Sequence, residues 1–176
     1  MQKLLRMYAR YNQQADQQVV QLLDKLSLEE LNQDRKSYYK SLAALVMHIT
    51  GANLYFQGMF RQALPANSAL QGTASLQMPE GDSLDAAGWS AVKDSTVQAD
   101  QALVDLIEHI EDKDLHAQVA VEWYGGKPAT VPVHYLFNIA IIHGVHHRGQ
   151  ISQILDELGM DNDFSGIDVK LLDVMQ

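Results

Sequence analysis

The chain has 176 residues, a length that fits one domain, and it contains no cysteine, which excludes disulfide bonds, thiolate metal sites and a cysteine nucleophile. With 13 Lys and Arg against 22 Asp and Glu, its net charge of −9 disfavours nucleic-acid and anionic-membrane partners. No apolar run reaches the roughly 20 residues of a membrane-spanning helix, and we expect a single cytoplasmic domain over residues 1–176.

Residues 2–25 predict an amphipathic helix. Apolar and small side chains recur there at steps of three and four residues, which places them on one face with one polar member, Asn12. We expect Asn12 to be a satisfied polar group of the core or its edge. The next segment, 26–38, predicts a connection with one helical turn, because Ser27 and Glu30 form a capping-box pattern.

A second helix is predicted from Ser41, a favourable N-cap residue, to about Ala63, ahead of Pro65. Its inward-facing stripe places one histidine among mostly apolar side chains: Ala44, Leu45, His48, Ala52, Tyr55, Phe56 and Met59. Residues 65–83 are rich in Ala, Ser, Gly, Gln and Pro, and this composition predicts an exposed loop without regular structure.

A third helix is predicted over residues 83–111, on the same helical spacing. The pattern then changes to alternation between Val119 and Val131, around a turn at Tyr124–Lys127. Alternation about a glycine-containing turn is typical of a hairpin. We therefore expect a small β-hairpin before the last helix.

The fourth helix is predicted to begin at Pro132, a residue suited to a first turn, and to end at Gly159. Apolar positions continue through residues 160–176, so we expect this tail to pack back on the helices. Together the segments predict an all-α protein, a four-helix bundle with a small β-hairpin before the last helix.

Three histidines suggest chemistry. His143 and His147 are four residues apart on the fourth helix, so both face one point from successive turns. They lie in the apolar stripe of that helix: Leu136, Ala140, His143, His147, Ile151, Ile154 and Leu158. Buried imidazoles need partners for both nitrogens, and an ion shared with His48 would supply one. Three histidine ligands leave a position for water, as in catalytic sites.

Other interpretations of these residues stay open. A core histidine is commonly just hydrogen-bonded, so the cluster could shape the core without an ion. His134 falls on the opposite side of the helix and is expected to be solvated, whereas His146 lies at the flank of the stripe. Arg148 could hold a carboxylate of a cosubstrate, or it could form a salt bridge to Asp156 or another surface acid.

The segment His143–Gln150, with the pattern HxxHHRGQ, resembles the signature of the DinB/YfiT-like family of metal-dependent four-helix-bundle proteins. Two weaker segments agree: Ser41–His48 is similar to that family's S(L)xxxLxH segment, and Tyr11-Asn12 to the YN of its first helix. The resemblance covers nearly the whole chain. It departs at Asn53 and Phe56, where many relatives carry Asp and Trp, so the pocket wall differs.

The resemblance implies a divalent metal ion, Zn, Ni or Fe, held by His48, His143 and His147, in a protein that is commonly a homodimer. Some members transfer low-molecular-weight thiols to electrophiles, and others isomerise small acids. Our leading hypothesis is a metal-dependent hydrolase or low-molecular-weight thiol S-transferase that acts on a small electrophile. The alternative is a non-catalytic metal-binding stress-response protein. The expected partners are a small-molecule substrate, which includes a low-molecular-weight thiol, and a second copy of the chain.

Overall fold

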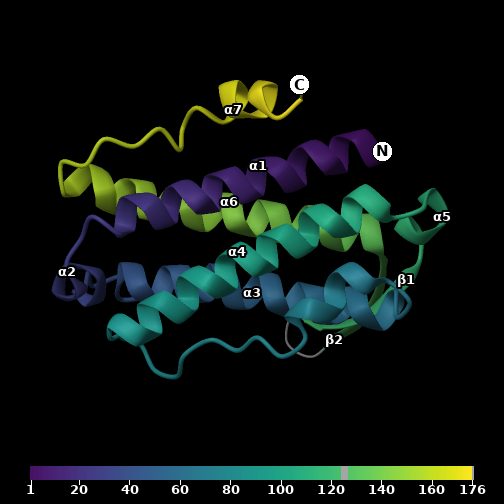
Figure 1. Ribbon diagram of the computed structural model, residues 1–176, viewed down its shortest axis with the longest axis horizontal. Helices are drawn as coiled ribbons and strands as arrows, with labels where there is room; N and C mark the ends of the chain where they lie inside the picture. The colour runs from purple at the N-terminus through teal and green to yellow at the C-terminus, as the bar shows by residue number, and fades with distance from the viewer. Residues whose placement is uncertain (124–126, 176) are drawn as a thin grey trace.

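The computed structural model describes residues 1–123 and 127–175, and its four long helices form a bundle (Figure 1). Helices α1 and α6 run in one direction along the long axis, and α3 and α4 run in the other. Helix α1 packs on α4 and α6, and α3 packs on the same two helices. The long helices are α1 (Gln2–Leu23), α3 (Leu42–Ala63), α4 (Ala86–His109) and α6 (Val133–Glu157).

The helices begin and end at residues whose side chains or backbone suit these positions. Ser27 forms the predicted capping box ahead of α2 (Leu28–Asn32). The side chains of Ser41 and Asp85 accept backbone N–H groups at the starts of α3 and α4. Gly159 follows α6 with φ at +70°, a conformation that favours glycine. None of the helices in the described residues is long and apolar enough to cross a membrane.

The predicted hairpin is present before the last helix. Strand β1 (Gln118–Trp123) pairs antiparallel with β2 (Lys127–Pro132), and the buried side chains of Val119 and Val121 join the apolar core. Residues 124–126, on which most of the predicted turn falls, lie outside the described residues.

The segment after α3 differs from its prediction as a loop without regular structure. It contains a 3-10 helix, η1 (Ser68–Thr73), because Leu70 is fully buried in the core and the Thr73 hydroxyl donates a hydrogen bond to Gln57 Oε1 at 2.6 Å. The predicted return of the tail is confirmed over residues 160–175, where α7 (Ile167–Asp173) packs on α1. A further short helix, α5 (Asp112–Leu115), precedes the hairpin.

The helical spacing predicts Tyr55 on the inward face of α3, and this prediction is wrong. Tyr55 is 57% exposed. The stripe that holds Ala44, His48 and Ala52 is only half-buried, because these residues line a cavity between α3 and the loop around Met78. Tyr55 continues this stripe by one turn and reaches solvent.

A buried polar layer separates two apolar clusters in the bundle. One cluster includes Leu5, Phe60 and Phe137 at the hairpin end, and the other lies toward α2. This buried polar layer consists of the buried Asn12, Asp16, Asp100 and Arg148 and the half-buried Asn53. Hydrogen bonds join these residues across all four long helices.

Candidate metal centre

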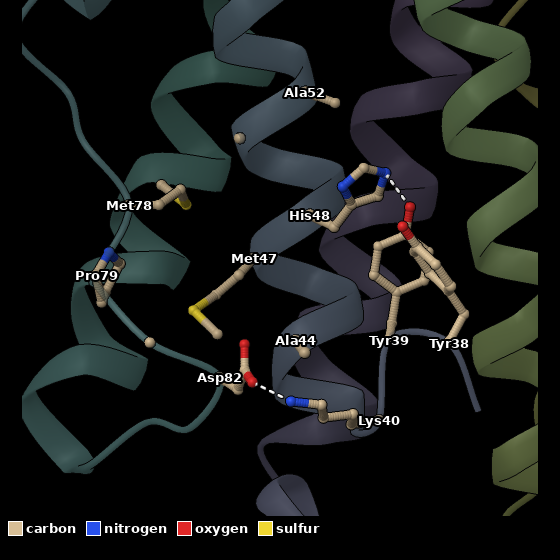
Figure 2. Close-up of a pocket in the computed structure, with 12 residues that line it drawn as sticks. Tyr38, Tyr39, Lys40, Ala44, Met47, His48, Ala52, Met78, Pro79 and Asp82 are labelled. Carbon is tan, nitrogen blue, oxygen red and sulfur yellow. Dashed lines mark hydrogen bonds and ion pairs between the residues drawn. The ribbon is translucent and has the colours of Figure 1, made fainter. Parts of the chain in front are cut away.

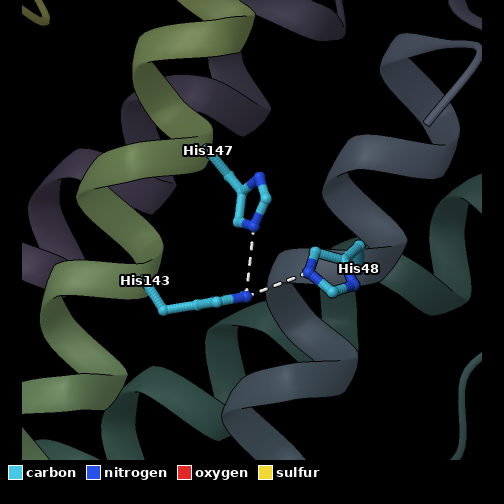
Figure 3. A group of neighbouring side chains, drawn as sticks. All are labelled: His48, His143 and His147. Carbon is cyan, nitrogen blue, oxygen red and sulfur yellow. Dashed lines mark hydrogen bonds between the residues drawn. The ribbon is translucent and has the colours of Figure 1, made fainter. Parts of the chain in front are cut away.

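The structure brings together the three histidines that the sequence pattern selects (Figure 3). His48 extends from α3, and His143 and His147 extend from successive turns of α6. The Nε2 atom of His143 lies 2.9 Å from Nε2 of His48 and 3.1 Å from Nε2 of His147. One ligand atom from each ring can therefore be chosen so that all three lie within 4.8 Å of one another.

Burial sets the protonation of the three rings. It lowers the pKa of each, and for His143 the further effect of neighbouring His147 and His48 brings the pKa to about 4. The imidazoles are therefore neutral at pH 7, and each has one nitrogen lone pair available. Neutral imidazole is the form of histidine that binds metal ions.

Gln150 fixes which nitrogen of His147 is free. His147 Nδ1 lies 2.7 Å from Gln150 Oε1, an acceptor, so the proton of the neutral ring is on Nδ1 and the lone pair is on Nε2. Side-chain acceptors of this kind orient metal-binding histidines in many proteins. The spacing of Gln150, three residues after His147 on one helix, is the sequence signal that could have indicated this contact.

The donor set fits a divalent ion. Zinc–nitrogen bonds of about 2.0–2.1 Å place two tetrahedral ligands about 3.3–3.4 Å apart. The Nε2 separations of 2.9 and 3.1 Å are a few tenths of an ångström shorter, so a small outward movement of the rings admits the ion. Three imidazoles suit zinc, nickel and iron alike, so the donor set does not select the metal.

Tyr39 lies beside the three histidines, although no motif or spacing in the sequence indicated it. Its hydroxyl oxygen lies 2.9 Å from His48 Nε2, and burial raises the pKa of the phenol, with a smaller effect from Tyr38 (Figure 2). Beside these rings, a cavity of about 380 Å³ extends between α3 and the loop around Met78. Met47 and Met78 give this cavity apolar walls.

Two other histidines do not join the cluster. His134 lies against His116, with ring centroids 5.4 Å apart, and it is half-buried instead of fully solvated. His146 is exposed, and its ring only borders that of His147, at 4.8 Å between centroids.

Arg148 pairs with an acidic residue, as one of its two interpretations expected, but the partner is the buried Asp16 and not Asp156 or another surface acid. Arg148 is only 2% exposed and its Nη1 donates to Asp16 Oδ1 at 2.7 Å and to Asn12 Oδ1 at 2.9 Å. The reason is the direction of the side chain, which crosses from α6 to α1 past Gly144. The expectation that Asn12 is a satisfied core group is confirmed.

The buried polar layer contains two carboxyl groups and one guanidinium group. Asp100 Oδ1 accepts from the side-chain amides of Asn12 and Asn53, each at 3.1 Å. Burial, together with the nearby Asp16, holds the pKa of Asp100 well above its usual range. The layer therefore pairs Arg148 with Asp16, next to Asp100, whose raised pKa favours the protonated form of its carboxyl group.

One of two comparisons with known proteins identifies the family of the chain. A model of the DinB family matches residues 1–164, so the chain belongs to the DinB family. A search of curated protein sequences returned no match.

Proposed function

We propose that this DinB-family chain is a metal-dependent enzyme, a hydrolase or a low-molecular-weight thiol S-transferase, that acts on a small electrophile. The observation that carries the proposal is the convergence of three neutral imidazoles through their Nε2 atoms, 2.9 and 3.1 Å apart. His48, His143 and His147 would hold a divalent ion, which is Zn, Ni or Fe. Such an ion lowers the pKa of a water or thiol bound to it and supplies a nucleophile at neutral pH.

The residues around the three ligands have separate tasks in this proposal. Gln150 keeps His147 in the tautomer that presents Nε2. The ligand set itself leaves coordination positions for an outside molecule, which favours catalysis over a closed structural site. Because the chain has no cysteine, a thiol substrate would have to come from solution.

The first test is elemental analysis of protein purified without an affinity tag or chelator. We expect about one ion per chain in the wild type and in the control His134→Ala, whose histidine lies outside the cluster. His143→Ala should lose the ion, because it removes the nitrogen that contacts both other rings. Full metal content in His143→Ala would exclude the site assignment.

A second test separates the enzyme from the non-catalytic alternative. The metal-loaded protein is incubated with a thiol and a small fluorogenic electrophile, and conjugation and hydrolysis are followed separately. Turnover that disappears in His143→Ala supports the enzyme. Stoichiometric metal without turnover of a broad electrophile panel would favour the metal-binding stress-response protein.

We also propose that the chain forms a homodimer in the cytoplasm. Exposed apolar side chains on α1 and α7, among them Leu4, Val169 and Leu172, offer a surface that a second copy could cover. Light scattering should give twice the 19.7 kDa chain mass, and the monomer mass across micromolar concentrations would contradict the proposal.

A further inference from the structure

Tyr39 extends from a short loop, residues 33–41, in which the backbone is strained. Lys36 and Lys40 have φ values of +58° and +61°, in the left-handed region that residues other than glycine seldom adopt. The N–H of Arg35 donates to the carbonyl oxygen of Lys40 at 2.6 Å, and the Lys40 ammonium pairs with Asp82. Strain of this kind persists only where the surroundings hold it, and it is concentrated at functional sites.

The loop places the phenol of Tyr39 against two of the three histidines. Its ring centroid lies 4.4 Å from that of His48 and 5.1 Å from that of His147, with an angle of 88° between the latter two planes. Figure 2 shows the hydroxyl directed at His48 Nε2, 2.9 Å away. The adjacent Tyr38, by contrast, is 89% exposed. The loop therefore turns one of two neighbouring tyrosines into the centre and the other into solvent.

The hydroxyl must change partner when an ion binds. In the metal-free protein it donates to His48 Nε2 whenever that nitrogen is unprotonated. A metal ion would take the same lone pair, and a half-buried hydroxyl without an acceptor is unfavourable. The new acceptor would then be an outside molecule, bound in the coordination position that the three histidines leave open.

We propose that Tyr39 contacts the substrate: its hydroxyl donates a hydrogen bond to the anionic donor atom, a thiolate sulfur, of a small thiol bound at the open position of the metal centre. The proposal rests on the proposed function, in which His48, His143 and His147 hold the ion. It assigns Tyr39 to binding of the thiol and leaves binding of the ion to the histidines. Hydrogen bonds to charged acceptors are the stronger ones, so loss of the hydroxyl should be measurable.

The test uses the cobalt(II)-loaded protein and 2-mercaptoethanol as the probe. Cobalt absorption in the visible range reports coordination, and a thiolate-to-cobalt band in the near ultraviolet reports binding of the probe. In Tyr39→Phe, which keeps the ring and removes only the hydroxyl, the Kd for 2-mercaptoethanol should rise about tenfold or more. The Kd for cobalt should stay equal or fall, because the competing hydrogen bond to His48 is gone. Tyr38→Phe, the matched control, should change neither constant.

The outcomes separate the two proposals. Wild-type protein that binds no stoichiometric cobalt overturns both. Cobalt binding with the same 2-mercaptoethanol Kd in wild type and Tyr39→Phe overturns only the role of Tyr39. Loss of cobalt from a folded Tyr39→Phe also overturns that role, because the hydroxyl would then be needed for the ion itself. Circular dichroism of each variant provides the check on folding.

Discussion

Gly144 lies where Arg148 crosses from α6 to α1, and this makes Gly144→Ala a sharp test of the buried polar layer. A Cβ at this position would stand 2.9 Å from Arg148 Nη1 and 3.0 Å from Asn12 Oδ1. The tip of a free arginine would simply move aside. Here Nη1 is held by Asp16 at 2.7 Å, and both side chains are buried, so movement opens an ion pair that water cannot reach.

The expected cost follows from opposing effects. Replacing glycine by alanine inside a helix stabilises it by about 1 kcal/mol. Overpacking costs about 1–3 kcal/mol, and complete loss of one partner from a buried ion pair costs about 3–5 kcal/mol. For a partial opening of the pair we expect a net loss of about 2 kcal/mol. At about 2–4 °C per kcal/mol for a domain of this size, Tm should fall by about 4–8 °C.

Gly149 provides the matched control on the same helix. A Cβ there meets no atom within 4 Å, and the residue is exposed. Gly149→Ala should therefore raise Tm by about 2–4 °C through helix propensity alone. Thermal unfolding followed by circular dichroism gives the Tm of both variants and of the wild type. If Gly144→Ala melts at or above the wild type, Arg148 leaves Asp16 without cost and the reasoning is refuted.

Four further predictions concern the buried carboxyl group, the histidines and the ion. Folding raises the pKa of Asp100, so the folded chain binds this proton more tightly than the unfolded chain does, and stability from this group is lost as pH rises above about 3.9, the unfolded value. Asp100→Asn should therefore melt higher than wild type at pH 7, by a margin that grows with pH. A lower Tm for this variant would contradict the raised pKa. In the metal-free protein the pKa values of His48, His143 and His147 are lowered, so stability should fall as pH drops from about 6.5 toward about 4, the value for His143. In melting curves recorded across this pH range, the Tm of His143→Gln should fall less than that of the wild type. Gln150→Ala should weaken metal binding about 10–100-fold in calorimetric titration, whereas Gln153→Ala on the exposed side of α6 should not. Chelation should lower Tm but keep the helical signal, because the two apolar clusters do not depend on an ion; an unfolded apo-protein at room temperature would indicate a structural site.

The parts of this structure that depend on local spacing could be predicted from the sequence. The long helices, the caps at Ser27 and Ser41 and the hairpin strands each follow from residues within a few positions of one another. The shared face of His143 and His147 belongs to the same class, because helical geometry alone fixes it. The family membership was likewise visible in a motif of eight consecutive residues.

The parts that depend on how helices and loops meet could not be predicted. Arg148 and Asp16 are 132 residues apart in the chain, and periodicity tells which face each occupies but not which helix it faces. Tyr39 belongs to a loop whose two positive φ values follow no periodic pattern. The 3-10 helix η1 depends on burial of Leu70, in a segment whose composition is that of an exposed loop.

The position of the buried polar layer has a consequence for the accuracy of the metal centre. A slip of one helical turn, about 5.4 Å, would carry Arg148 away from Asp16 and Asn12 and leave buried charged groups unpaired. Arg148 is the neighbour of His147, and Thr50, two residues after His48, joins α3 to Thr96 of α4 by a hydrogen bond of 2.7 Å. These contacts fix the positions of α3 and α6 along the bundle axis. They therefore also fix the position of His48 relative to His143. The relative positions of the three histidines thus depend on contacts made by side chains outside the cluster, those of Arg148 and Thr50.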